Sequence, residues 1–197
     1  MHKVVSVWIG LALIVGLAAA PVMADDTGQV SQLLKSKIDA VLSVLENKDM
    51  AEAEKKDKIM AIVEPVIDFE LMAKLTLGKT NWAKLSGTQQ QEFIDLFVER
   101  LKDSYLDKTT LYSDQKVVYH PASKAGSKIH MPVDVVTQDK TAEVLYKFYS
   151  AGSQWRVYDV EINGVSLIKS YRSQFDEILR GGTVEDLFDE LKRATEE

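Results

Sequence analysis

Apolar residues recur every three or four positions through most of the first half of the chain. Over residues 30–45 this spacing is typical of an amphipathic helix that buries one stripe. A second helix is predicted from about Asp49, and Pro65 should end or kink it because proline has no amide hydrogen to donate. A shorter helix over residues 70–86 follows, with Gly78 as its stop signal.

The clearest helical pattern covers residues 85–113. Ser86 or Thr88 can cap its first turn, and a glutamine three residues after either one would complete a capping box. The apolar positions fall on one face, which the helix should bury; they are Phe93, Phe97, Leu101, Tyr105 and Tyr112.

After the long helix the period changes to two, which is typical of strands with one buried face. Four strands are predicted over residues 116–121, 128–136, 141–150 and 154–162, and turn residues separate them at hairpin distances. Pro132 suggests an edge strand or a bulge. The expected inward positions are Val117, Tyr119, Ile129, Met131, Val133, Val135, Ala142, Val144, Tyr146, Phe148, Tyr158, Val160 and Ile162.

Residues 163–164 raise a question of topology, because an Asn-Gly pair between apolar residues is a strong hairpin signal. The apolar residues that follow recur instead at helical spacing, at Leu167, Ile168, Tyr171 and Phe175. We therefore expect a bend or bulge at which the last strand passes into a helix.

The order of elements predicts an α+β fold. Several helices come first, an antiparallel sheet of about four strands follows, and two helices end the chain, the second beginning after Thr183. In such folds the helices pack on one face of a curved sheet.

Residues 1–24 have the layout of a secretory signal peptide, with a basic start, an apolar run and a small-residue site that ends at Ala24. The alternative is a retained membrane anchor, since the apolar run is just long enough to span a bilayer. With cleavage after Ala24, residues 25–197 should form one exported domain of ordinary size.

Composition narrows the possible partners. The chain has no cysteine, so it can have neither a disulfide framework nor a lipid-modified N-terminal cysteine. It carries 24 basic and 30 acidic residues, and loss of Lys3 with the leader makes it more acidic. No nucleic acid is expected as a partner, and bulk charge does not favour an anionic bilayer.

No residue pattern indicates catalysis, and no metal or cofactor is predicted. His120 and His130 lie in predicted strands without a partner at metal-ligand spacing. The segments "GVSLI" and "LGKT" lack the glycines of a nucleophile elbow and a phosphate loop. Asp159 and Glu161 are conceivable acid–base residues, but their parity along the strand favours a solvated face.

Two long segments resemble one family. They are "LGKTNWAKLSGTQQQEFIDLFVERLKDSYLDKTTLY" and "WRVYDVEINGVSLIKSYRSQFDEILRGGTVEDLFDELKR", and the most specific part is the strand that runs into "GVSLIKSYRSQF". They resemble the toluene-tolerance, or MlaC, family of periplasmic phospholipid-binding proteins, and the likeness covers about residues 33–193.

The resemblance implies a non-enzymatic, monomeric shuttle in the periplasm of a Gram-negative cell. Such a carrier would move glycerophospholipid between an outer-membrane lipoprotein complex and an inner-membrane ABC transporter complex with an MCE-domain protein. Its fold would be like that of nuclear transport factors, with an apolar cavity between helices and sheet. Alternatives are a carrier of hopanoid or another apolar lipid, a small-molecule enzyme in a cone-shaped α+β fold, and an interaction module.

The resemblance also implies which side chains contact lipid, and we expect about half of these to do so while the rest form ordinary core. Lys169 and Arg172 are candidates for the headgroup phosphate, although each also suits a helix surface. The candidates for the acyl chains are Phe69, Met72, Leu75, Phe93, Phe97, Leu101, Tyr105, Met131, Val133, Val135, Val144, Tyr146, Phe148, Val160, Ile162, Val165, Ile168 and Tyr171.

Overall fold

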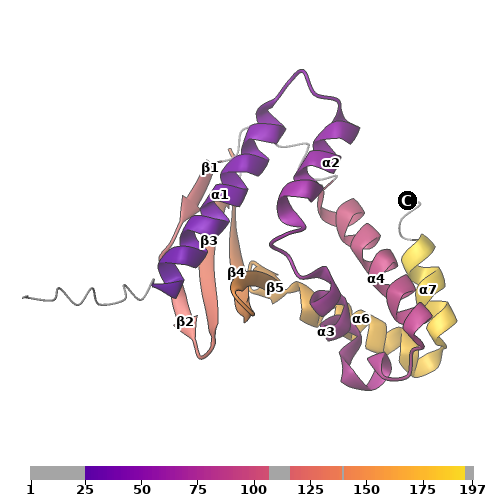
Figure 1. Ribbon diagram of the computed structural model, residues 1–197. Helices are drawn as coiled ribbons and strands as arrows, with labels where there is room; N and C mark the ends of the chain where they lie inside the picture. Colours follow the sequence, from indigo (N-terminus) through magenta and orange to yellow (C-terminus); the bar gives the residue numbers. More distant parts are fainter. Residues whose placement is uncertain (1–24, 107–115, 139, 194–197) are drawn as a thin grey trace, which may run out of the picture.

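A computed structural model describes residues 25–106, 116–138 and 140–193 (Figure 1). The helices are α1 (Asp26–Glu46), α2 (Glu52–Val63), α3 (Phe69–Trp82), α4 (Gly87–Leu101), the π-helix η1 (Lys102–Leu106), α6 (Leu167–Gly181) and α7 (Val184–Arg193). The strands are β1 (Lys116–Tyr119), β2 (Ser123–Ala125), β3 (Lys128–Val136), β4 (Thr141–Ala151), β5 (Gln154–Ile162) and β6 (Val165–Ser166). The predicted signal peptide and Tyr112 lie outside the described residues.

Two helix boundaries fall where the sequence signals place them. Helix α2 ends at Val63, two residues before Pro65. Of the two possible caps for α4 the chain uses Ser86: its Oγ accepts from the backbone N–H of Gln89 at 3.2 Å, and the Gln89 side chain accepts from the Ser86 N–H at 3.0 Å. This reciprocal pair satisfies two donors that a helix N-terminus otherwise leaves free.

Gly78 interrupts α3 without ending it. Its φ of 73° and ψ of 158° break the helix, yet a further turn continues to Trp82. A Cβ at this position would lie 2.4 Å from a guanidinium nitrogen of Arg172. Glycine suits this position because the backbone angle strains other residues, and the Arg172 side chain occupies the space that a Cβ would take.

The sheet has six strands in the order β1-β3-β4-β5-β6, with β2 beside β1 on the same edge of β3. Every pair of neighbouring strands is antiparallel. The four predicted strands are confirmed as β1, β3, β4 and β5. The sequence patterns missed β2 and β6, which have three and two residues.

Pro132 lies neither on an edge strand nor at a bulge, contrary to expectation. It is in β3, opposite the break between β1 and β2, where its carbonyl accepts from His120 N at 3.1 Å. In an antiparallel strand the N–H and C=O of one residue point the same way, so the missing donor faces this break. The proline therefore leaves the reciprocal bond to His120 unmade, at the point where this edge of the sheet is interrupted.

The bulge occurs in β5 instead. The register pairs Lys147 with Asp159 but Phe148 with Val157, which leaves Tyr158 as the extra residue. Val157, which is 1% exposed, therefore takes the inward position that strict alternation assigned to Tyr158.

The prediction of a mere bend at Asn163-Gly164 was wrong, because these residues form a tight hairpin turn. Their φ angles are 49° and 79°, and Ile162 pairs directly with Val165. Two successive positive φ values characterise the turn whose twist suits a two-residue hairpin. The predicted helix also forms, since the returning strand ends at Ser166, which caps α6 through Lys169 N.

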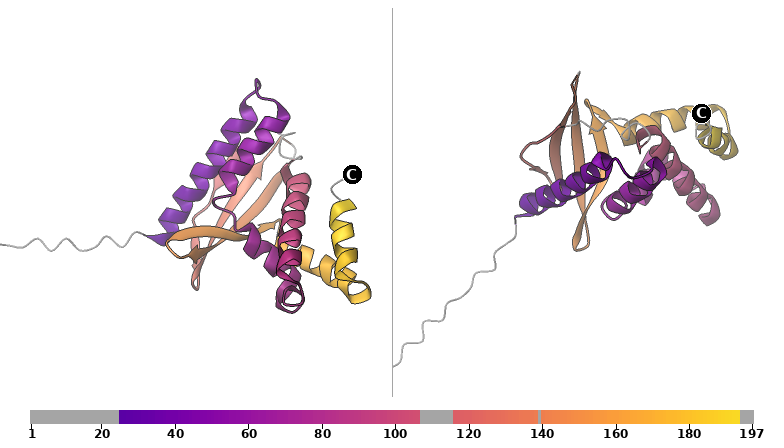
Figure 2. Two further views of the ribbon diagram at one scale, coloured as in Figure 1. Left: turned by 45° about the vertical axis from the view of Figure 1, so that its right-hand side comes forward. Right: turned by 90° about the horizontal axis from the view of Figure 1, so that it is seen from above.

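The hydrophobic core consists of two clusters, and Ile67 packs against both. In Figure 2, α1 lies along the sheet, while α3, α4, α6 and α7 group at one side of it. The sheet cluster lies between α1 and the inner face of the sheet; its buried members are Val30, Leu34, Val66, Ile129, Met131, Val133, Phe148 and Val157. The helix cluster joins α3, α4, α6 and α7; its buried members include Met72, Leu77, Phe93, Phe97, Leu101, Ile168, Tyr171, Phe175, Leu187 and Phe188.

Replacing Ser86 by alanine should lower the free energy of unfolding by about 1 kcal/mol, because the Gln89 N–H in the first turn of α4 loses its acceptor. Thr88→Ala is the matched control and should change it by less than about 0.5 kcal/mol. Chemical denaturation of both variants checks this. Equal losses would mean that Thr88 shares the capping role.

Candidate functional site

The inner face of the sheet is most completely covered at one end. In the row Ile129, Phe148 and Val157, which the strand register places side by side, no residue is more than 1% exposed. Helix α1 and Val66 pack over this end. This part of the face is ordinary core.

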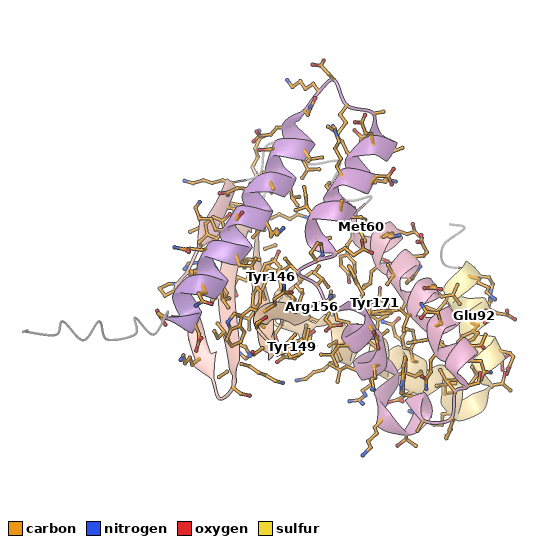
Figure 3. All side chains as sticks on the ribbon, in the orientation of Figure 1. Met60, Glu92, Tyr146, Tyr149, Arg156 and Tyr171 are labelled. Atoms are coloured by element: carbon orange, nitrogen blue, oxygen red, sulfur yellow. The ribbon has the colours of Figure 1, made fainter. Side chains whose placement is uncertain are left out.

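Toward the other end of the strands the inner face stays half-buried. Met131 and Val133 on β3 are buried, but their neighbours across β4 and β5 are only partly covered. We call this region the open apolar face; its residues are Val135, Val144, Tyr146, Val160 and Ile162. Figure 3 labels Tyr146 on the sheet, together with Met60 of α2 and Tyr171 of α6.

Tyr146 is the one polar side chain of the open apolar face. Burial raises the pKa of its phenol to about 12, so the group stays neutral at physiological pH. An uncharged face of branched aliphatic side chains and one aromatic ring suits an apolar ligand.

The predicted helix residues form a core and do not face the open apolar face directly. Phe93 and Phe97 are fully buried, and the ring of Phe97 lies 5.3 Å from that of Tyr171 in an edge-to-face contact. These candidates either belong to the buried helix cluster or pack against it as half-buried residues. They are Phe69, Met72, Leu75, Phe93, Phe97, Leu101, Tyr105, Ile168 and Tyr171.

The candidate residues thus fall into separate groups. Met131, Val133 and Phe148 belong to the sheet cluster, and Tyr146 and Val160 pack against it. Val135, Val144 and Ile162 complete the open apolar face, whereas Val165 is 58% exposed. The structure therefore brings the sheet candidates together and separates them from the helix candidates.

Tyr105 is positioned by the π-helix η1 that follows α4. Burial, followed by its hydrogen bond with Tyr171, raises the pKa of the Tyr105 phenol. A π-helical turn is uncommon and often re-aims side chains at functional sites. Here it directs a half-buried hydroxyl toward α6.

The two headgroup candidates are exposed on α6. The backbone of Lys169 belongs to the first turn, where its N–H donates to Ser166 Oγ at 3.2 Å. The guanidinium of Arg172 packs over Gly78 of α3. Neither side chain is placed against the open apolar face.

Asp159 is not solvated, contrary to expectation. Its side chain lies on the sheet face opposite the open apolar face, and the residue as a whole is only 5% exposed. It accepts hydrogen bonds from Ser166 Oγ at 2.8 Å, from Ile168 N at 3.3 Å and from Lys147 Nζ at 3.0 Å. The alternation of the strand correctly predicted its face, but could not show that the start of α6 covers it.

Lys147 is held between two carboxylates, with its Nζ 2.7 Å from Glu161 and 3.0 Å from Asp159. Burial by itself lowers the pKa of this ammonium group, but the hydrogen bonds to Glu161 and Asp159 outweigh it and the net pKa is raised. Lys147 therefore stays charged, and Asp159 is fully engaged in holding β5 to α6.

A second polar contact, which sequence patterns did not identify, joins α3 to β5. Asp68 caps α3 through Leu71 N at 3.0 Å, accepts from the Tyr149 hydroxyl, and lies 3.4 Å from Arg156. Arg156 also donates to Ile67 O at 2.8 Å. An aspartate just before a helical stretch is a recognisable N-cap signal, but its partners on the distant strand are not.

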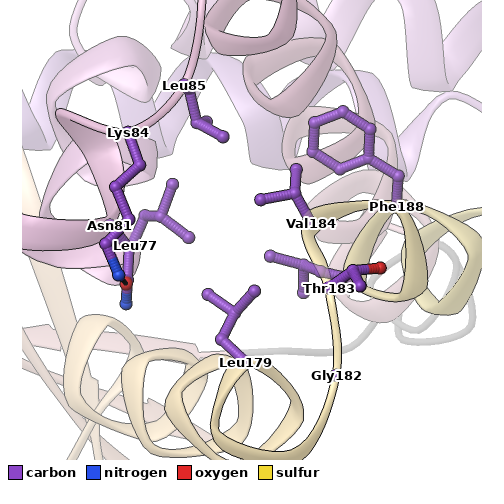
Figure 4. Close-up of a pocket in the computed structure, with 10 residues that line it drawn as sticks. Leu77, Asn81, Lys84, Leu85, Leu179, Gly182, Thr183, Val184 and Phe188 are labelled. Carbon is purple, nitrogen blue, oxygen red and sulfur yellow. Dashed lines mark hydrogen bonds between the residues drawn. The ribbon is translucent and has the colours of Figure 1, made fainter.

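Neither of two pockets elsewhere in the molecule combines the sheet and helix candidates. One, of about 190 Å³, lies among α3, α6 and α7 and has Leu77, Leu179 and Phe188 in its wall (Figure 4). It is smaller than usual ligand pockets. The other, of about 420 Å³, includes Phe69 but is lined by five carboxylates: Glu64, Asp68, Glu70, Asp95 and Glu99. Such a wall does not suit an acyl chain.

Within residues 25–106, 116–138 and 140–193, no group of three or more His, Cys, Asp or Glu residues is arranged to hold a metal ion. The same described segments contain no helix long and apolar enough to cross a membrane.

Comparison with known proteins gives consistent matches. The toluene tolerance protein ttg2D of Pseudomonas putida is 28% identical over 129 residues, which are 64% of this chain and 60% of that protein. The intermembrane phospholipid transport system binding protein MlaC of Haemophilus influenzae is 23% identical over 136 residues, which are 66% of this chain and 63% of that protein. The aligned regions thus span about three fifths of these relatives.

A solved structure shows the same fold. It is a phospholipid-binding protein from Ralstonia solanacearum, determined in complex with a phospholipid; the TM-score is 0.74 at 24% identity, with 84% of this chain and 96% of that chain covered. The family model described as MlaC protein matches residues 35–193, most of the sequence. The chain therefore belongs to the MlaC family.

Proposed function

We propose that this protein is a lipid carrier that binds the acyl chains of a glycerophospholipid. The observation that carries the proposal is the open apolar face, a set of half-buried apolar side chains on an otherwise packed sheet. The names of two relatives and the bound phospholipid of the Ralstonia solanacearum protein support it. The predicted signal peptide supports a periplasmic location.

Acyl-chain binding is physically reasonable because burial of one CH₂ group gains about 0.8 kcal/mol relative to water. A chain of roughly 14 such groups would gain on the order of 11 kcal/mol. A bilayer offers nearly the same gain, so extraction is a small difference between large terms. The carrier site need only match the membrane, and the direction of transfer must come from partners.

We propose a shuttle between two such partners, an outer-membrane lipoprotein complex and an inner-membrane ABC transporter complex with an MCE-domain protein. The description of the Haemophilus influenzae relative as part of an intermembrane phospholipid transport system supports this role. A hopanoid or another apolar lipid is the alternative cargo, since an aliphatic face does not distinguish acyl chains from other hydrocarbons. A non-enzymatic role agrees with an Asp159 carboxylate that is engaged on the opposite face.

The direct test is to purify the protein from a lipid-containing host and record native mass spectra, followed by lipid analysis of the organic extract. We expect protein with bound glycerophospholipid. Apoprotein alone after gentle handling would contradict the proposal, and a different extracted lipid would replace the proposed cargo.

Replacing Val160 by tryptophan should lower the bound lipid per protein by about half or more, because the indole occupies space on the open apolar face. Val118→Trp is the matched control, since Val118 is a valine of the same sheet whose side chain points away from the inner face. Lipid extraction and thermal unfolding of both variants check this. Unchanged lipid content in Val160→Trp would remove this residue from the site.

Replacing Asp159 by asparagine should lower the free energy of unfolding by about 1–3 kcal/mol, because the half-buried Lys147 loses one of its two charged partners. Lipid bound per folded protein should stay close to wild type, since the residue lies on the other face of the sheet. Denaturation and lipid extraction measure both quantities. Loss of lipid without loss of stability would assign Asp159 a direct role in binding.

A further inference from the structure

The open apolar face continues to the edge of the sheet along one row of side chains. The register pairs Val133 with Val144, Val144 with Ile162, and Ile162 with Val165. Because directly paired residues point to the same face, all four side chains lie on the inner face. Their exposure rises along the row from 1% at Val133, through half-buried Val144 and Ile162, to 58% at Val165.

The position of Val165 is fixed by the residues around it. Asn163 is bound to β4 by two hydrogen bonds: its N–H donates to Glu143 O at 2.8 Å, and its side-chain oxygen accepts from Glu143 N at 2.9 Å. On the other side, Ser166 Oγ donates to Asp159. Hydrogen bonds on both sides therefore fix the hairpin that carries the exposed Val165.

Val165 and Val118 are the two large apolar side chains classed as exposed in the described parts of the chain, at 58% and 36%. Val118 has a different environment: it alternates with the inward Val117 and Tyr119 and pairs with Asp134 on the outer face. Val165 instead extends a continuous apolar row. Its exposure thus has an explanation that does not apply to Val118.

Resting on the proposed function, we propose that acyl chains enter and leave the carrier across the β5–β6 edge, along the row that ends at Val165. A methylene group costs about 0.8 kcal/mol when it passes into water. A row of apolar side chains that reaches the surface keeps part of the moving chain covered and so lowers the barrier to transfer. Val165 is the last contact on this path.

The test measures transfer of a fluorescent phosphatidylcholine between the full protein and zwitterionic phosphatidylcholine vesicles. Val165→Lys should slow uptake and release by about tenfold, the factor that a barrier higher by about 1.4 kcal/mol produces. Because both directions slow together, the ratio of the two rates should change far less. Val118→Lys adds the same charge on the outer face and should transfer at the wild-type rate.

Two further measurements keep the test decisive. Val165→Thr preserves the branched shape and should slow transfer less than lysine does, so it serves if the lysine variant unfolds. Release into a soluble cyclodextrin acceptor should be slowed like release into vesicles. An effect confined to vesicles would overturn the proposal and make Val165 a membrane contact.

Unchanged transfer rates in folded Val165→Lys, or equal slowing in Val118→Lys, would also overturn it. If the proposed function itself were incorrect, the wild-type protein would take up no phospholipid at all, which distinguishes that outcome from an incorrect entry path.

Discussion

The carboxylate of Asp159 holds together the part of the fold on which the arrangement of both hydrophobic clusters depends. It binds Ser166 and the first turn of α6, while Lys147 neutralises its charge from the neighbouring strand. Helix α6 carries Tyr171 and Phe175 of the helix cluster, whereas β5 carries Val157 of the sheet cluster. An aliphatic pair could fill the same space, but without fixed hydrogen-bond directions it would define the angle between strand and helix less well.

Much of the fold could be predicted because the spacing of hydrophobic residues along the chain directly indicates whether a segment is helix or strand. Pro65, Ser86 and the alternation of β3 and β4 act through their own backbone or their immediate neighbours, and each was interpreted correctly apart from the choice of cap. The bulge at Tyr158 could not be found this way, since one extra residue shifts parity without changing composition. At Asn163-Gly164 the turn and helix signals were treated as exclusive, although a two-residue strand accommodates both.

The candidate site was harder to predict because an apolar stripe does not specify what covers it. Phe97 and Val160 both lie on inward faces, yet one is fully buried by other aromatic rings and the other stays half-buried. Parity therefore predicted which strand residues share the open apolar face, but the separation of this face from the helix cluster depends on long-range packing. The same holds for Asp159, whose face was predicted and whose burial beneath the start of α6 was not.

The break opposite Pro132 has a consequence for how copies of the chain meet one another. A protein with apolar surface on a sheet risks pairing its strand edge with the edge of another molecule. Here that edge is divided into strands of four and three residues, which carry Lys116 and Lys124. At the opposite edge β6 pairs with the end of β5, and the Ile67 bridge occupies Val157 nearer its start. Within the described residues neither edge offers a long, uncharged template, so the open apolar face can stay partly exposed without inviting β-aggregation.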